Sequence, residues 1–285
     1  MINRLAIIGV GLIGGSLALA LRQAGYVGEI IGTSRREPHL QQAKELGVID
    51  DYELDMVKAV AGADMVFISV PLGAMQAVFE AIKPAVNNDT IITDGGSAKG
   101  CVVRDAKTVF GEVPAGLVPG HPIAGTEQSG VAAAFPELYR DRRVILTPLD
   151  TTSPEALASV RDMWQAAGAQ VEEMSVQHHD EVLAATSHLP HMLAFGLVDS
   201  LARMKDNDEI FRYAAGGFRD FTRIASSDPV MWRDICLYNR EAVLKMAQSY
   251  HQDLDEMMQA IEQGDGDALL DIFSRAKAAR DRFCG

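Results

Sequence analysis

Residues 7–14 read IIGVGLIG, a GxGxxG pattern that ends an apolar run and begins a helical stretch. Within a strand–helix–strand unit, this pattern is typical of a turn that binds a dinucleotide. Gly9 permits the tight turn, Gly11 lets the backbone approach a pyrophosphate, and Gly14 allows the helix to pack closely on the strand. The amides that begin the helix then face the phosphates. We therefore predict a dinucleotide site at this turn.

The end of the second predicted strand carries the sequence TSRR at residues 33–36, where NAD-binding enzymes place a carboxylate on the ribose hydroxyls. A hydroxyl group followed by two guanidinium groups suits a 2′-phosphate. We therefore predict NADP as the cofactor, bound in part by Ser34, Arg35 and Arg36, with NAD as the alternative. The remaining predicted cofactor contacts are Leu12, Ile13, Ser69 and Pro71.

Short runs rich in Ile and Val alternate with amphipathic stretches up to about residue 172. This alternation indicates repeated strand–helix units and a parallel sheet. The predicted class is α/β, with an N-terminal Rossmann-type, dinucleotide-binding domain over residues 1–173. We predict strands at 5–10, 29–33, 64–70, 90–94, 115–119 and 144–147, and helices at 12–24, 73–81, 98–110 and 154–167.

The rest of the chain contains no further strand pattern and reads as several helices. One helix is predicted over 230–250, with Asp228 as its N-cap and Pro229 in its first turn. The stretch 241–260 carries apolar residues on more than one side, which fits either an intramolecular core or a dimer interface. We predict an all-helical C-terminal domain over 174–285 that packs closely on the first domain, with a ligand cleft between them.

The formal net charge of −13 argues against nucleic acids and anionic membranes as partners, because both require a dominant basic surface. The expected partners are therefore small molecules. If a substrate is itself an anion, a few local Arg and His groups must hold it against the overall field. Individual arginines in this sequence are informative for that reason.

The three cysteines are Cys101, Cys236 and Cys284, which are widely spaced and form no CxxC pair. This pattern predicts neither a disulfide framework nor a zinc knuckle, and it fits a reducing cytoplasm. The uncharged run 5–21 resembles a signal peptide or a short membrane span. Its glycines would break such a helix, and the run is shorter than a bilayer span. We predict a cytoplasmic protein.

Two further glycine-containing loops follow predicted strands, DGGSAKG at 94–100 and GHPIAGTE at 120–127. In an open parallel sheet, loops at the carboxyl ends of strands face the cofactor crevice. Ser97 and His121 lie in these loops and could form an acid–base pair. Histidine is the side chain best suited to accept an alcohol proton near neutral pH.

The helical half contains four histidines within residues 178–191. No supporting set of Cys, Asp and Glu appears at metal-site spacing, so we predict no metal. His188 and His191 are three residues apart and would share a helix face, although Pro190 would kink that helix. His179 with Asp180 could simply cap or orient the helix.

The sequence closely resembles the prephenate/arogenate dehydrogenase family over essentially its whole length. The resemblance implies a Rossmann-type domain followed by a helical domain that builds a homodimer. It also implies oxidative decarboxylation of a cyclohexadienyl acid on the route to tyrosine. The motifs that carry it are GVGLIGGS (9–16), DGGSAKG (94–100), HPIAGTE (121–127), HHDEVLAATSHLPH (178–191) and GGFRDFTRIASSDPVMW (216–232).

The resemblance also implies roles for individual residues. His121 resembles the catalytic histidine, which takes the proton of the ring hydroxyl as hydride leaves the same carbon, and Ser97 resembles its hydrogen-bonding partner. Arg223 resembles the arginine that binds the ring carboxylate of the substrate. The positions that line or support the pocket, complete the His121 loop or shape the pocket mouth correspond to His179, His188, His191, Thr126, Glu127, Arg219, Asp220 and Trp232.

The resemblance leaves two anionic substrates open, prephenate with a side-chain keto group and arogenate with an amino group. We expect conversion of prephenate to 4-hydroxyphenylpyruvate, with an arogenate dehydrogenase that forms tyrosine directly as the alternative. A 3-hydroxyacid dehydrogenase would leave HPIAGTE unexplained. A catalytically silent NADP-binding sensor is a more distant alternative, because Ser97, His121 and Arg223 occur together.

Overall fold

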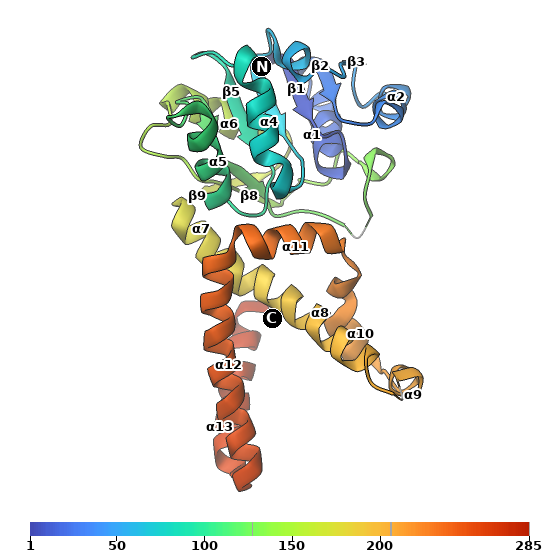
Figure 1. The fold of residues 1–285 in the computed structure, drawn as a ribbon, viewed down its shortest axis with the longest axis vertical. Coiled ribbons are helices and arrows are strands. Elements are labelled where there is room, and N and C mark those ends of the chain that lie inside the picture. The colour runs from blue at the N-terminus through green and yellow to red at the C-terminus, as the bar shows by residue number, and fades with distance from the viewer. Residues whose placement is uncertain (127, 206, 285) are drawn as a thin grey trace. The chain divides into compact units, whose positions relative to one another are not determined.

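The computed structural model describes residues 1–126, 128–205 and 207–284. The chain forms two compact units, Met1–Arg240 and Glu241–Gly285 (Figure 1). Along the described residues, no helix is both long enough and apolar enough to cross a bilayer.

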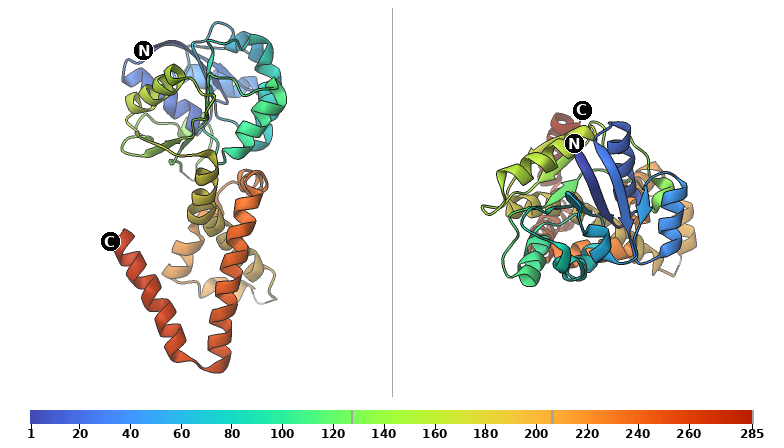
Figure 2. Two further views of the ribbon diagram at one scale, coloured as in Figure 1. Left: turned by 90° about the vertical axis from the view of Figure 1, so that its left-hand side faces the viewer. Right: turned by 90° about the horizontal axis from the view of Figure 1, so that it is seen from above.

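A six-stranded parallel sheet forms the centre of the first unit, with helices on both of its sides (Figure 2). Its strand order is β3-β2-β1-β4-β5-β6, so the order reverses between β1 and β4. This is the order of doubly wound dinucleotide-binding folds, in which ligands bind at the carboxyl ends of the strands beside the reversal. The strand bounds are β1 Ile2–Ile8, β2 Val27–Thr33, β3 Asp51–Tyr52, β4 Met65–Ile68, β5 Ile91–Asp94 and β6 Leu117–Val118.

The two faces of this sheet bury separate apolar clusters, because neighbouring residues of a strand point to opposite faces. In β1, Leu5 and Ile7 pack with helices α1 and α6, whereas Ala6 and Ile8 pack with α4 and α5. Burial on both faces explains why the strands read as continuous apolar runs. The helices of this domain are α1 Leu12–Gln23, α2 Glu37–Glu45, α3 Met56–Val60, α4 Met75–Ile82, α5 Gly100–Phe110 and α6 Pro154–Ala166.

The predicted strands at 5–10, 29–33, 64–70 and 90–94 are confirmed as β1, β2, β4 and β5, with shifted ends. Two further predicted strands are present, but they differ from the prediction in length or in the sheet that they join. The strand predicted at 115–119 is shortened to β6, and the one at 144–147 lies outside the parallel sheet. It is β8 (Arg143–Leu146) of a second sheet ordered β7-β8-β9, in which β7 (Gly120–Pro122) is antiparallel to β8 and β9 (Gln170–Glu173) is parallel to it.

Pro119 separates β6 from β7. Proline has no amide hydrogen to donate to a sheet. The carbonyl of Pro119 accepts a hydrogen bond of 2.9 Å from the amide of Thr147, which follows β8. The chain therefore leaves the large sheet after β6 and continues in the small one as β7.

The helices that follow β9 begin with α7 (Val176–Leu183) and a π-helical turn, Ala184–His188. Pro190 lies in the first turn of α8 (Leu189–Ala202). The kink predicted at this proline is therefore a π turn, a feature frequent at functional sites. The remaining helices of this unit are α9 Asn207–Arg212, α10 Gly216–Thr222 and α11 Pro229–Tyr238.

The predicted N-cap Asp228 is confirmed, because its side chain accepts a hydrogen bond of 2.8 Å from the amide of Met231. The single helix predicted over 230–250 was wrong, since α11 ends at Tyr238. Asn239 leaves the helical conformation with φ −108° and ψ 33°. Its side-chain amide donates instead to the backbone carbonyl of Asp180 at 2.9 Å.

The second unit consists of α12 (Arg240–Gln263), except for its first residue, and α13 (Gly266–Cys284). They are joined at Gly264, whose positive φ of 64° favours glycine. The domain boundary predicted at 173 stays a prediction. Compact packing divides the chain at residue 240. The reason is that α7 packs on α5, and α11 packs on the short turn before α4. Large exposed apolar side chains in this unit are Leu244, Leu254, Met258, Ile261, Leu270, Phe273 and Phe283.

Candidate active site

A cavity of about 380 Å³ lies at the carboxyl ends of β1, β2 and β4. This is the position beside the strand-order reversal where such folds bind a dinucleotide. Leu12, Ile13 and Gly14 form the first turn of α1, directly after the cavity-lining Gly11. The other predicted cofactor residues all line the cavity: Gly9, Gly11, Ser34, Arg35, Arg36, Ser69 and Pro71.

The three glycines of the first loop differ in what a side chain would meet. Gly9 has φ +93°, and a Cβ there would lie 2.5 Å from the carbonyl oxygen of Ser69. A Cβ on Gly14 would lie 2.5 Å from Ser69 Oγ. A Cβ on Gly11, by contrast, would meet no described atom within 4 Å outside its chain neighbours and the backbone of its own helix. The open space at Gly11, in front of the α1 amides, fits a pyrophosphate.

The basic end of the cavity contains Ser34, Arg35 and Arg36, together with His39 from α2. The Ser34 hydroxyl holds this loop by donating to the carbonyl of Arg36 at 3.3 Å. Among the described residues that line the cavity, there is no Asp or Glu. Sequence reasoning missed His39; its place in the first turn of α2 was the available signal.

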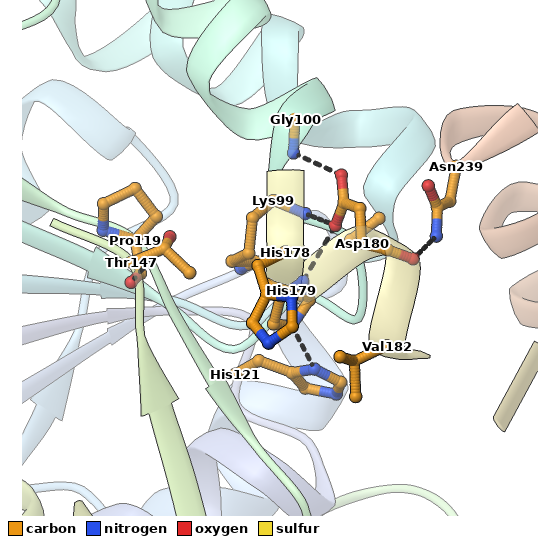
Figure 3. A network of polar contacts seen from close by, with 12 residues as sticks. Lys99, Gly100, Pro119, His121, Thr147, His178, His179, Asp180, Val182 and Asn239 are labelled. Atoms are coloured by element: carbon orange, nitrogen blue, oxygen red, sulfur yellow. Dashed lines mark hydrogen bonds and ion pairs between the residues drawn. The ribbon is translucent and has the colours of Figure 1, made fainter. Parts of the chain in front are cut away.

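His121 lies on β7 and is only 8% exposed. Its Nδ1 lies 2.9 Å from Nε2 of His179 on α7 (Figure 3). Burial lowers the pKa of His121 well below its ordinary value, and the nearby His179, Lys99 and His188 lower it further. The imidazole is therefore neutral around pH 7, the form that accepts a proton.

A fully buried ion pair between Asp94 and Lys99 holds the backbone beside His121. Lys99 Nζ donates to the Asp94 carboxylate and, at 2.6 Å, to the carbonyl of Gly120. Asp94 accepts in turn from the amides of Gly120 at 3.1 Å and Gly96 at 2.8 Å. Both polar backbone groups of Gly120 are thus held by one ion pair. Sequence reasoning missed Asp94 and Lys99, although both stand in the motif DGGSAKG.

Asp180 joins α7 to the beginning of α5 (Figure 3). Its two carboxylate oxygens accept hydrogen bonds of 2.8 Å each from the amides of Lys99 and Gly100. Its Oδ1 also lies 2.8 Å from Nδ1 of His179. Of the two roles expected for His179 with Asp180, capping or orienting their helix, capping is wrong for Asp180. Ser175 caps α7, and Asp180 instead caps α5.

His179 and His188 are both completely buried. Both ring nitrogens of His179 have partners, so the supporting role that the resemblance implied suits it better than direct substrate binding. His188 Nδ1 lies 3.1 Å from the side-chain amide of Asn239, and burial, together with His179, lowers the pKa of His188 to about 4. Within the described residues, no three His, Cys, Asp or Glu side chains are grouped to hold a metal ion.

A second group of predicted site residues surrounds Trp232 of α11. The ring of His191 stacks on Trp232 with centroids 3.6 Å apart, and His188 meets the same indole edge-on at 6.2 Å. Burial lowers the pKa of His191, and the charge of Arg223 also lowers it. Arg223 begins the short turn that packs on α8. His188 thus meets Trp232 and is also near enough to His121 to lower the pKa of that ring.

The other predicted site residues lie on loops and on the surface. Ser97 is half-buried in the loop before α5, and its backbone lies close enough to His188 to raise the pKa of that ring. Thr126 is exposed after β7, where its hydroxyl accepts from the amide of Gln128 at 3.2 Å. Arg219 and Asp220 are exposed on α10. Glu127 lies outside the described residues, and a hydrogen bond between Ser97 and His121 stays a prediction.

A doubly wound sheet with a dinucleotide cavity, and a neutral buried histidine at the same edge, define a nicotinamide-dependent dehydrogenase. Residues 17–173 match the family model of the prephenate dehydrogenase nucleotide-binding domain, and residues 175–275 match that of the prephenate dehydrogenase dimerization domain. The chain belongs to the prephenate dehydrogenase family, and it is a nicotinamide-dependent oxidoreductase.

The three similar proteins described next each match nearly the full length of this chain. The chain is 41% identical to the cyclohexadienyl dehydrogenase of Zymomonas mobilis subsp. mobilis, over 98% of this chain and 95% of the relative. It is similar to the crystal structure of Aquifex aeolicus prephenate dehydrogenase in complex with hydroxyphenyl propionate and NAD+, with 37% identity, a TM-score of 0.93 and coverage of 99% and 98%. It is also similar to Synechocystis arogenate dehydrogenase, with 30% identity, a TM-score of 0.82 and coverage of 98% and 99%.

Proposed function

We propose that this chain oxidatively decarboxylates prephenate to 4-hydroxyphenylpyruvate in tyrosine biosynthesis, with His121 as the general base. The observation that carries the proposal is the placement of His121. His121 comes shortly after β6 in the chain. The residue before it, Gly120, donates its amide to Asp94, the last residue of β5. Because strands β1 and β4–β6 are parallel, this imidazole lies at the same sheet edge as the loop that lines the cofactor cavity.

The reaction needs a base, an anion site and exact placement of the ring. A nicotinamide dinucleotide held in the cavity by the Gly9–Gly11 loop and the Ser34–Arg36 loop would supply the hydride acceptor for the ring carbon that carries the hydroxyl. His121 takes the hydroxyl proton, and the electron pair of the O–H bond becomes part of the new carbonyl. The ring carboxylate then leaves as carbon dioxide, driven by aromatisation. The electron pair of the broken C–C bond enters the ring, and the carbonyl oxygen takes back a proton from the His121 imidazolium to form the phenol hydroxyl. The residues of this chain therefore hold the ring, remove one proton and keep the carboxylate in place until it leaves.

We assign the anion site to Arg223, in the neighbourhood of His191 and Trp232. Arg223→Ala is expected to raise the KM for prephenate about 10- to 100-fold with a smaller change in kcat, because a charge-assisted hydrogen bond to a carboxylate is lost. Steady-state kinetics against prephenate concentration measure this. Arg203→Ala is a matched control, since Arg203 is exposed and pairs with Asp199. An unchanged KM in the Arg223 variant, equal to that of the control, would contradict the assignment.

We propose NADP as the preferred cofactor, supported by the hydroxyl and two guanidinium groups at one end of the cavity. Replacing both Arg35 and Arg36 with alanine is expected to raise the KM for NADP about 10- to 100-fold while that for NAD changes little, because only NADP carries the 2′-phosphate. Arg140→Ala is the control, since Arg140 is exposed and outside the cavity. A strong NAD preference in the unmodified enzyme would remove the idea.

The substrate alternative is arogenate, which the similarity to an arogenate dehydrogenase keeps open. Four initial rates, with prephenate or arogenate and with NAD or NADP, distinguish the alternatives through the absorbance of the reduced nicotinamide. We expect the prephenate and NADP combination to be fastest. Arogenate turnover alone would replace the proposed substrate, and comparable rates would indicate a broad cyclohexadienyl dehydrogenase. Cofactor binding without turnover would leave the silent sensor as the explanation.

We further propose a homodimer built by the helical part. The support is the match of residues 175–275 to a dimerization domain and the exposed apolar side chains of α12 and α13. Surfaces of this kind are typical of interfaces between subunits. Sedimentation at micromolar concentration tests this proposal, and a monomer would contradict it. A cytoplasmic location stays a prediction from the cysteine pattern.

A further inference from the structure

Asp180 is bound in a way that keeps its carboxylate ionised. Its oxygens accept hydrogen bonds from the amides of Lys99 and Gly100 and from the ring of His179, each at 2.8 Å. Burial alone would raise the pKa of Asp180, but these three hydrogen bonds lower it overall. An ionised carboxylate only accepts hydrogen bonds. The contact with His179 therefore requires a proton on His179 Nδ1.

The position of the proton on His179 determines where His121 carries its own proton. Burial lowers the pKa of His179, so its ring is neutral near pH 7 and carries a single ring proton. With this proton on Nδ1, the Nε2 of His179 has a lone pair. The 2.9 Å contact from this Nε2 to Nδ1 of His121 then needs the proton on His121. The lone pair of His121 is left on its Nε2.

We infer that Asp180 is a positioning residue: through His179 it fixes the tautomer of His121, so that Nε2 of His121 receives the hydroxyl proton of the substrate. The inference rests on the proposed role of His121 as the base. When that proton arrives, the O–H bond breaks and an N–H bond forms. His121 becomes an imidazolium, and its Nδ1–H bond to His179 spreads the charge toward the Asp180 carboxylate, as in hydrolase triads.

The relay formed by Asp180, His179 and His121 is anchored from three directions. Asp180 stands on α7 and is bound to the first amides of α5, while Asn239 donates to its backbone carbonyl at 2.9 Å (Figure 3). The other charged or titratable groups near these rings are Lys99, Asp94 and His188. Lys99 and Asp94 form a buried ion pair of their own, and His188 is held by Asn239. Asp180 is therefore the charged group that forms a hydrogen bond with one of the two histidine rings, that of His179.

The sharpest test changes the acceptor at His179 and leaves the cap on α5 intact. His179→Gln can place its amide oxygen near the former Nε2, where it still accepts from His121 Nδ1. His179→Leu removes the acceptor and leaves both tautomers of His121 available. We expect kcat of the Leu variant to fall about 10- to 100-fold, a fraction of what a positioned base contributes. The Gln variant should recover most of this loss, and KM should change little in either.

Asp180→Asn is the second variant. Its side-chain amide can donate to His179 Nδ1, which moves the proton of His179 to Nε2 and makes Nδ1 of His121 the acceptor. We expect kcat to fall and the acidic limb of the kcat/KM profile to move to lower pH, since the His121 imidazolium loses the support of a negative charge. A purely structural role would reduce activity without moving that limb. An unmoved limb, together with equal kcat in the Gln and Leu variants, would overturn the inference.

A spectroscopic measurement separates this inference from the proposed function. In protein labelled with ¹⁵N-histidine, the ring signals of His121 are assigned by their loss in His121→Asn. We expect a protonated Nδ1 and an unprotonated Nε2 in the unmodified enzyme and in His179→Gln, and a mixture in His179→Leu. The opposite tautomer in the unmodified enzyme would reject the relay, even if prephenate is turned over. The expected tautomer without turnover would instead reject the proposed function.

Discussion

Replacing His121 with asparagine is expected to lower kcat for prephenate about 10²- to 10⁴-fold, the range that a positioned general base contributes. Asparagine can still donate a hydrogen bond near Nδ1, so the fold around β7 and α7 should persist. It has no group that takes a proton near neutral pH. The KM for prephenate and the affinity for the cofactor should therefore change much less than kcat.

Steady-state kinetics and a cofactor titration by fluorescence provide the measurement. His178→Asn is the matched control, because its side chain is exposed and has no place in the proposed site. In the unmodified enzyme, the lowered pKa of His121 means that the base form persists as the pH falls through 6.5. We expect the acidic limb of kcat/KM to lie below that value. Turnover of the Asn variant close to that of the control would reject His121 as the base.

The sheet and the cofactor cavity could be predicted because their signals are local. A GxGxxG loop between a buried strand and a helix has few other uses, and strands buried on both faces are apolar throughout. Strand β7 had no such signal. Three residues, Gly120–Pro122, contain neither an apolar run nor an alternating pattern. Their pairing with β8 depends on where Pro119 directs the chain, which only the folded structure fixes.

The parts of the site that sequence reasoning missed depend on contacts between distant residues. Lysine is rarely buried unless it is paired, so nothing local marked Lys99 as a fully buried side chain. Asp180 was expected, with His179, to cap or orient the helix that carries it, but its carboxylate also binds the amides of Lys99 and Gly100, 80 and more residues earlier in the chain. Asn239 ends α11 because its side chain bonds Asp180 and His188. Helical propensity carries no information about such partners.

Breaking the buried ion pair is expected to have the largest effect on stability. In Lys99→Met, the carboxylate of Asp94 remains buried without its cation, and the carbonyl of Gly120 loses its donor. Removing one member of a buried pair typically costs about 3–5 kcal/mol. We expect a loss of this size in the free energy of unfolding, measured by urea denaturation. Lys44→Met is the control, because Lys44 pairs with Asp51 at the surface and should matter little.

The double variant Asp94→Asn with Lys99→Met separates the charge from the geometry. With both charges removed, much of the lost stability should return, because no unpaired charge remains buried. The side-chain amide introduced at position 94 can still accept from the amide of Gly120, but the Gly120 carbonyl has no donor in place of Lys99. Activity should therefore recover less than stability, since His121 is attached to a backbone held on one side only. Full recovery of stability and activity in the double variant would mean that the ion pair serves the fold alone. If Lys99→Met alone were as stable as Lys44→Met, the charge of Asp94 could not be buried as the structure has it.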